Sequence, residues 1–398
     1  MTIEATQTAP VMERPKVLGR RLRLGMIGGG QGAFIGAVHR IASRLDDRYE
    51  LVAGALSSDP DRAKASAEEL HIAPDRAYTS FEEMAAKEPL RDDPIDVVAI
   101  VTPNHMHYPA ARAMLEAGFH VICDKPMTTT VEESAKLVQV QQDTGKLFLL
   151  THNYTGYPMV RQARAMVEAG ELGKIRLVQV EYAQDWLTEP LERTGQKQAS
   201  WRTDPKRSGA GGCIGDIGTH AYNLATFVSG MKATEVLAEL TSFVEGRTLD
   251  DDAQMLLRYE NGAKGMLWAS QVAPGNENGL RLRVYGEKGG LEWSQEDPNY
   301  LDVSPYGKTS LRITRNGNGA IDASASISRI PGGHPEGYLE AFATLYNEFA
   351  DMLTARILDM PQPQNSSLLP SVSDGLDGLR FIETAVSSSQ SGGVWRKL

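Results

Sequence analysis

Cysteine is scarce in this sequence of 398 residues, which contains only Cys123 and Cys213. Two cysteines cannot build a disulfide framework or a four-cysteine zinc site, so we expect both to be small buried residues and the chain to hold no metal. The sequence also lacks an apolar run of about 18 residues, which argues against a membrane span and a membrane partner. We therefore expect a cytoplasmic location.

Basic residues are fewer than acidic ones: 41 Lys and Arg stand against 51 Asp and Glu, and the net charge is −10. Nucleic-acid binding needs clustered Lys and Arg, so no nucleic-acid partner is expected. Hydrophobic residues make up 41% of the chain, as in globular proteins. The chain is also too long for one ordinary core, which predicts two domains.

The order of apolar runs divides the chain into three regions. Residues 1–20 have no apolar run and predict an N-terminal arm, either disordered or lying on a neighbouring subunit. In residues 21–151 apolar strands alternate with helices, which predicts an α/β class fold with a doubly wound parallel sheet of the Rossmann type. In residues 152–398 short strands separated by hairpin signals predict an α+β domain with a large, mostly antiparallel sheet. We expect this domain to bind the substrate and to form the oligomer contacts.

A glycine-rich loop follows the first predicted strand and precedes a helix. Such a loop lets the backbone approach a pyrophosphate, whose charge faces the amides of the helix N-terminus. A nucleotide site is therefore expected in this region, although a structural glycine turn would look similar. The residues expected to contact the cofactor here are Gly28, Gly30, Gln31, Gly32, Ala33, Phe34 and Ile35.

The end of the second predicted strand bears on which dinucleotide binds. An NAD-binding domain usually has an Asp or Glu here for the ribose hydroxyls, whereas this chain has Ser57 and Ser58. Asp59 comes two residues later and is expected to cap a helix. Serine could bind a ribose hydroxyl or tolerate a 2′-phosphate beside Arg62. NAD is the expected cofactor, and NADP stays open.

Three residues that can handle a proton come from distant segments. Asp124-Lys125-Pro126 ends an apolar strand, and Gly215-Asp216-Ile217-Gly218-Thr219-His220 follows a glycine-rich turn. Lys125 at the carboxyl end of a parallel strand would lie where ligands bind in such sheets. The alternative interpretation is structural, with Asp216 as a helix cap, His220 as a packed histidine and Lys125 as a solvated strand end.

Six motifs occur in this chain in the order and spacing of one enzyme family. By these motifs the chain resembles the Gfo/Idh/MocA oxidoreductases, the family of glucose-fructose oxidoreductase and inositol dehydrogenase. The resemblance extends from about Leu22 to the C-terminus. The family's Glu-Lys-Pro is Asp-Lys-Pro here, and its frequent Asn-x-Arg is Asn153-Tyr154-Thr155. The motifs are Gly28-Gly29-Gly30 with Gly36-x-x-His39, Thr102-Pro103-Asn104-x-x-His107, Gly118-Phe119-His120-Val121, Asp124-Lys125-Pro126, Trp201-Arg202 and Gly215-Asp216-x-Gly218-x-His220.

The resemblance implies hydride transfer between a nicotinamide cofactor and a hydroxyl of a cyclic polyol or sugar. It implies catalytic roles for Lys125, Asp216 and His220, with His220 as the base because its ordinary pKa lies near neutrality. Additional cofactor contacts are expected from Thr102, Pro103, Asn104, His107, Asp124 and Lys125. Substrate contacts are expected from Lys125, His152, Tyr154, Tyr157, Trp186, Trp201, Arg202, Asp216 and His220.

Two further alternatives remain open from the sequence. The aromatic residues around Trp186 and Trp201 suit the C–H face of a sugar, but they could also form a lid or a subunit contact. An NAD-dependent glycosidase that oxidises a ring carbon transiently and then eliminates would use the same lysine, base and nicotinamide. A homodimer or homotetramer is expected, with a small-molecule sugar or polyol as the substrate.

Overall fold

The computed structural model describes residues 17–398, so most of the predicted arm over residues 1–20 lies outside the described residues. Five strands of the first half form a parallel sheet in the order β2-β1-β3-β4-β5. The order reverses direction beside β1, and ligands bind at the carboxyl ends of strands next to such a reversal. The strands are β1 (Leu22–Gly28), β2 (Tyr49–Ala55), β3 (Val97–Val101), β4 (His120–Cys123) and β5 (Phe148–Leu150).

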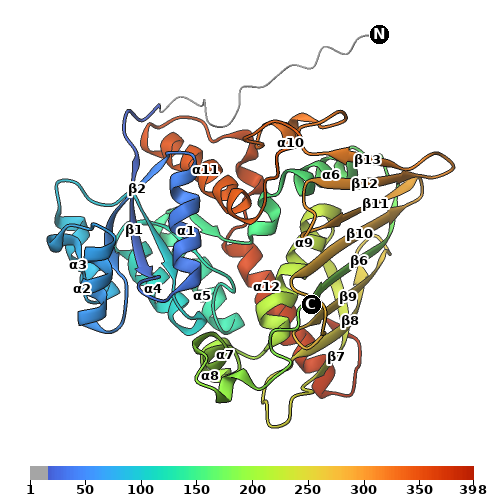
Figure 1. Ribbon diagram of the computed structural model, residues 1–398, viewed down its shortest axis with the longest axis horizontal. Coiled ribbons are helices and arrows are strands. Elements are labelled where there is room, and N and C mark those ends of the chain that lie inside the picture. The colour runs from blue at the N-terminus through green and yellow to red at the C-terminus, as the bar shows by residue number, and fades with distance from the viewer. Residues whose placement is uncertain (1–16) are drawn as a thin grey trace.

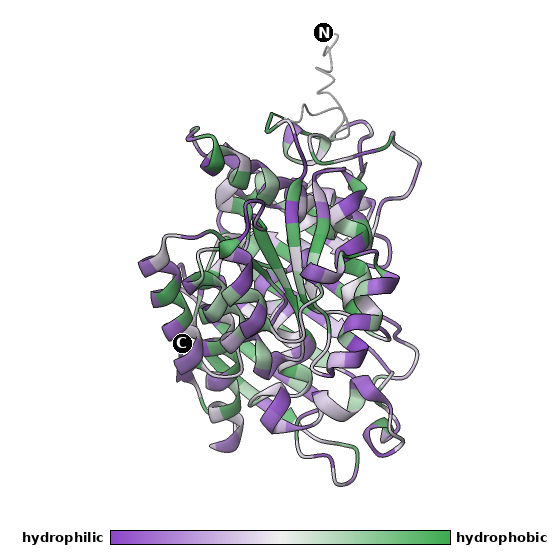
Figure 2. Ribbon diagram, turned by 90° about the vertical axis from the view of Figure 1, so that its left-hand side faces the viewer, coloured by the Kyte–Doolittle hydropathy of each residue, from purple (hydrophilic) through white to green (hydrophobic). Residues whose placement is uncertain are grey.

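Helices cover this parallel sheet, as the predicted Rossmann fold requires. All five residues of β3 are buried, because a central parallel strand is covered on both faces. Figure 2 shows the mostly hydrophobic strands between helices whose outer surfaces are hydrophilic. The helices of this half are α1 (Phe34–Leu45), α2 (Pro60–Glu69), α3 (Phe81–Lys87), α4 (His107–Glu116) and α5 (Val131–Thr144).

The second half contains a nine-stranded sheet in the order β13-β12-β11-β10-β6-β9-β8-β7-β14 (Figure 1). Within this sheet, among residues 17–398, the β6–β9 pairing is parallel and every other pairing is antiparallel, so the predicted mostly antiparallel sheet is confirmed. The strands are β6 (Ile175–Ala183), β7 (Ala233–Thr241), β8 (Asp252–Tyr259), β9 (Lys264–Ser270), β10 (Gly279–Gly286), β11 (Gly289–Ser294), β12 (Tyr300–Pro305), β13 (Leu311–Thr314) and β14 (Arg396–Lys397).

Helices lie between the two sheets (Figure 1). Phe342, Tyr346 and Phe349 of α11 belong to the same buried cluster as Leu24 of β1, so a late helix completes the core of the first half. None of the described helices is long and apolar enough to cross a membrane. The helices of this half are α6 (Pro158–Glu168), α7 (Lys197–Arg202), α8 (Pro205–Ser208), α9 (Thr219–Ser229), α10 (Asp322–Ala325), α11 (Tyr338–Ile357) and α12 (Val372–Gln390).

Candidate active site

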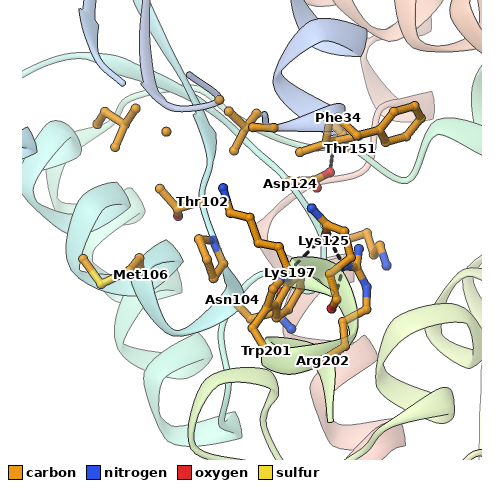
Figure 3. A pocket seen from close by; sticks show the side chains of 18 of the residues that line it. Phe34, Thr102, Asn104, Met106, Asp124, Lys125, Thr151, Lys197, Trp201 and Arg202 are labelled. Atoms are coloured by element: carbon orange, nitrogen blue, oxygen red, sulfur yellow. Dashed lines mark hydrogen bonds between the residues drawn. The ribbon is translucent and has the colours of Figure 1, made fainter. Parts of the chain in front are cut away.

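A cavity of about 1120 Å³ runs from the glycine loop to the junction between the two halves. Its walls include the carboxyl ends of the parallel strands, the start of α1, the short helix α7 and the segment before α9. Figure 3 shows Lys125 near its centre, with Asp124 and Thr151 on one side and Trp201 and Arg202 of α7 on the other. Residues from both halves of the chain therefore face one space.

The glycine loop leaves no room for a side chain at Gly30 or at Gly36, which follows it in the first helix. A Cβ at Gly30 would lie 2.7 Å from the carbonyl oxygen of Leu56, and a Cβ at Gly36 would lie 2.4 Å from Cα of Gly29. The residue before α1, Ala33, provides no side-chain cap, so the first amides of the helix stay available. Uncapped amides next to a close-packed glycine turn fit a pyrophosphate. The residues of this segment therefore fit a dinucleotide.

Serines and an arginine line the cavity where the second strand ends. Ser57, Ser58 and Arg62 all contribute to its wall. Asp59 is used as the cap of α2, since its Oδ1 accepts the Arg62 backbone amide at 2.9 Å, as the sequence predicts. The carboxylate of Asp59 is therefore committed to the helix, and the wall at this end presents hydroxyls and one guanidinium.

Asp124 is the shorter acid of the Asp-Lys-Pro motif, and two side chains face it. The Thr151 hydroxyl donates to its Oδ1 at 2.7 Å, and Nε2 of His39 lies 3.8 Å from the same oxygen. His39 is buried and bonds through Nδ1 to the Tyr346 hydroxyl at 2.8 Å. Burial alone would raise the pKa of Asp124, but His39, Lys125 and Thr151 outweigh it and lower that pKa. The carboxylate therefore stays charged.

Lys125 and Asp216 form an ion pair that joins the two halves. Lys125 Nζ donates to Asp216 Oδ1 at 3.1 Å and also to the Asp216 carbonyl oxygen. Arg202 Nε at 3.1 Å and Gln271 Nε2 at 2.9 Å donate to Asp216 Oδ2. Burial would raise the pKa of Asp216, but Arg202 and Lys125 overcome it and lower that pKa. Asp216 lies in a π-helical turn at Ile214–Gly218, a distortion common at functional sites.

His220 lies in the first turn of α9, next to this ion pair. Burial lowers the pKa of His220 well below its usual value, and the positive charge of Lys125 adds to that effect. Its Nδ1 is buried with no hydrogen-bond partner among residues 17–398, so Nε2 is the ring nitrogen left to face the cavity. The Tyr154 ring packs edge-on against it at 4.9 Å. The imidazole is therefore neutral and held rigidly.

Most of the expected site residues line this cavity, and four of them do not. Gly32, His107, His152 and Tyr157 are not part of the lining. His107 instead bonds the carbonyl oxygens of Thr102 and Pro126, at 2.8 and 2.7 Å. The expected residues that do line it are Gly28, Gly30, Gln31, Ala33, Phe34, Ile35, Ser57, Ser58, Arg62, Thr102, Pro103, Asn104, Asp124, Lys125, Tyr154, Trp186, Trp201, Arg202, Asp216 and His220.

The structure adds lining residues that the sequence did not single out. They come from strand ends and from the start of α11, where no short motif marks them. Thr151 and Gln184 directly follow the ends of β5 and β6. Their place at a strand end is the only signal in the sequence that could have marked them as cavity residues. The added polar and aromatic residues include Thr151, Tyr182, Gln184, Asn278, Gln295, Tyr338 and Phe342.

Comparison with known proteins agrees with the two-part fold described above. Residues 22–152 match the oxidoreductase family with an NAD-binding Rossmann fold, and residues 160–292 match the GFO/IDH/MocA C-terminal domain. The chain is 30% identical to a levoglucosan dehydrogenase from Pseudarthrobacter phenanthrenivorans, over 72% of this chain and 76% of that protein. The protein belongs to the GFO/IDH/MocA oxidoreductase family, and its N-terminal half is an NAD-binding domain.

Two solved structures resemble the whole chain. An oxidoreductase from Sinorhizobium meliloti is 54% identical, with a TM-score of 0.86, and the match covers 95% of this chain and all of that one. An inositol dehydrogenase homologue from Azotobacter vinelandii, solved with NADH and myo-inositol, is 34% identical with a TM-score of 0.88. That match covers 95% of this chain and 98% of that one. Both similarities extend through the nine-stranded sheet.

Proposed function

We propose that this oxidoreductase is a dehydrogenase that oxidises a hydroxyl group of a cyclic polyol or sugar with NAD or NADP. The observation that carries the proposal is the meeting of Lys125, Asp216 and His220 in the cavity that begins at the glycine loop. An ammonium, a carboxylate and a neutral imidazole supply what alcohol oxidation needs: stabilisation of negative oxygen, a hydroxyl acceptor and a base.

His220 is the base in this proposal. Its lowered pKa keeps the imidazole neutral well below pH 6.5, so Nε2 can accept the hydroxyl proton of the substrate. Lys125 would stabilise the negative charge that develops on the substrate oxygen, and Asp216 keeps that ammonium in place. Bound NAD supplies the hydride acceptor for this chemistry. Asp216 also offers oxygen atoms to a neighbouring hydroxyl.

The polar lining of the cavity around Lys125 supports a hydroxylated substrate. Asn153, Gln184 and Asn278 contribute side-chain amides, and Tyr154 and Tyr182 contribute phenol groups. All of these groups can both donate and accept hydrogen bonds. Such a wall suits a ligand with several hydroxyls. Relatives with a levoglucosan dehydrogenase activity or with bound myo-inositol point to the same class of neutral ring compounds.

Either dinucleotide fits the adenosine end of the cavity. NAD is the expected cofactor, in line with the family's NAD-binding fold. Ser57, Ser58 and Arg62 line the wall with hydroxyls and a guanidinium, and the Asp59 carboxylate next to them is engaged as a helix cap. NADP is therefore tested beside NAD in every assay.

The test is a screen of polyols, aldoses and glycosides with both dinucleotides, read by absorbance of the reduced nicotinamide and by release of free sugar. The proposal expects reduced nicotinamide to accumulate in a 1:1 ratio with oxidised substrate. His220→Ala should lower this rate, while His71→Ala, at a histidine outside the cavity, serves as the control. Cleavage of a glycoside with no net change in the nicotinamide would contradict a dehydrogenase and favour the glycosidase.

The open face of the nine-stranded sheet supports the proposed homodimer or homotetramer. Leu177, Leu256, Met266 and Tyr285 on neighbouring central strands are 38–53% exposed. A patch of apolar side chains on one sheet face is typical of an association surface. Light scattering coupled to gel filtration would give the mass in solution, and Met266→Glu should lower it if this face forms the contact.

A further inference from the structure

A second cavity, of about 1170 Å³, lies directly beside the candidate active site. Asn278, Gln295 and Tyr338 line both cavities, so these three side chains form the wall between them. The rest of the second cavity is built from Tyr157 and from the segments around residues 275–277, 296–300, 314–315 and 333–337. None of the residues committed to the hydride-transfer chemistry lines it.

The shared wall is polar and its side chains are fixed by hydrogen bonds. Asn278 Oδ1 accepts the Tyr182 hydroxyl at 2.8 Å, and Asn278 Nδ2 donates to Gln295 Oε1 at 3.2 Å. Gln295 Nε2 in turn donates to the Tyr157 hydroxyl at 3.4 Å. Tyr157 lines the second cavity, and Tyr182 lines the first. One chain of hydrogen-bonding groups therefore runs from one cavity to the other.

A buried ion pair supports the floor of the second cavity. Arg315 and Glu336 both line it, with side chains only 2% and 1% exposed, and Arg315 Nη1 lies 2.9 Å from Glu336 Oε1. Arg315 also donates to Asn299 and to carbonyl oxygens of the loop that precedes α11. This floor is therefore rigid before any ligand arrives.

One oxygen of this floor has no partner. Glu336 Oε1 accepts from Arg315 and from the backbone amides of Arg329 and Ile330. Its other oxygen, Oε2, is buried with no hydrogen-bond partner among residues 17–398. An unsatisfied buried carboxylate oxygen is costly, and a hydroxyl donor from a ligand would satisfy it. Glu336 lines the second cavity, so its carboxylate can serve as an acceptor for a hydroxylated group there.

The entrance of the cavity is acidic. Glu277, Glu296 and Asp297 are exposed around it, and its only arginine is already engaged with Glu336. Carboxylates around an entrance disfavour a phosphate or another anion and leave neutral hydroxylated groups unaffected. The ligand that suits both the floor and the entrance is a neutral sugar.

We propose that the second cavity is a subsite for a second sugar unit, so that the enzyme accepts a neutral disaccharide or glycoside whose reacting ring lies beside Lys125. This inference rests on the proposed function, because it places the first ring in the candidate active site. The shared wall of Asn278, Gln295 and Tyr338 contacts both rings, and Glu336 Oε2 accepts a hydroxyl of the outer one.

The experiment measures kcat/KM for glucose, cellobiose, maltose and trehalose with the full chain and NAD or NADP. Asp297→Trp places an indole at the exposed rim of the cavity, and Lys308→Trp, at an exposed residue outside it, is the matched control. Asp297→Trp should lower the ratio of disaccharide to glucose kcat/KM about tenfold, whereas Lys308→Trp should leave it unchanged. Glu336→Gln should lower the same ratio, with Glu292→Gln outside both cavities as its control.

Equilibrium binding distinguishes a failure of the subsite proposal from a failure of the proposed dehydrogenase function. Titration of the NADH-loaded protein with each disaccharide should show binding that Asp297→Trp weakens and Lys308→Trp does not. Oxidation of single sugars or polyols with no disaccharide oxidised or bound would overturn the subsite and leave the proposed function standing. Disaccharide binding that depends on Asp297, with no sugar or polyol oxidised, would support the subsite and overturn the proposed function. A ratio unchanged in both Asp297→Trp and Glu336→Gln would also overturn the subsite.

Discussion

Replacing Lys125 with methionine removes the ammonium and keeps most of the volume of the side chain. Lys125 donates to Asp216 Oδ1 at 3.1 Å, and their side chains are 13% and 15% exposed. Asp216 keeps Arg202 and Gln271 after the change, so its carboxylate stays partnered. We therefore expect the free energy of unfolding to fall by only about 1.5–3 kcal/mol, the scale of one hydrogen bond to a charged group.

The same substitution should be far more costly to catalysis. A single preorganised donor to a developing oxyanion contributes about 3–4 kcal/mol, which corresponds to a loss of about 10² to 10³ in kcat. The assay follows reduced nicotinamide with the accepted substrate, and NADH affinity is measured by fluorescence. Lys64→Met, at an exposed lysine outside the cavity, is the control. A kcat within threefold of the parent, with the fold intact, would refute the role of Lys125.

Three further predictions follow from the cofactor loop and the buried histidines. Ser57→Asp should lower kcat/KM for NADP at least tenfold through repulsion of the 2′-phosphate, while Ser57→Asn should not; equal NADP kinetics in both variants would place the ribose elsewhere. Gly36→Ala sets a Cβ 2.4 Å from Gly29 Cα, so it should lower the unfolding free energy by about 1–3 kcal/mol and weaken NADH binding; an unchanged melting curve would be inconsistent with this contact. Burial lowers the pKa of His105 and His107 and, further down, that of three other histidines, to about 4 for one, to about 3 for another and well below 6.5 for the third. The unfolded chain therefore binds more protons in acid, partly offset by Asp250, whose pKa burial raises to about 6. The unfolding free energy should fall by about 3 kcal/mol from pH 6 to pH 5, measured by urea denaturation; a flat profile would contradict these pKa shifts. The three histidines are His120, His152 and His220.

The sequence was most informative where local chemistry decides the structure. The glycine turn, the cap at Asp59 and the all-apolar strand β3 are set by neighbouring residues, and the parallel sheet they predict is confirmed. The motif residues Lys125 and Asp216 were expected together, and the structure places them in one ion pair. Both Cys123 and Cys213 are buried and free, as expected.

Long-range packing was the part that the sequence could not supply. The edge strands β13 and β14 are short, and their pairing depends on the rest of the sheet, so no local pattern predicts them. No local pattern links His39 of α1 to Tyr346 of α11, which lie 307 residues apart and share a hydrogen bond. The same holds for Asn278 and Gln295, which face the cavity only because β10 and β11 pair beside it.

The central claim is that Lys125 and His220 act on a substrate hydroxyl beside the nicotinamide. A crystal structure with NADH and the substrate found by the screen tests it most directly. We predict that the reacting carbon lies in van der Waals contact with C4 of the nicotinamide and that its hydroxyl hydrogen-bonds both Lys125 Nζ and His220 Nε2. A substrate bound with those two side chains pointing away from its reacting hydroxyl would contradict the account.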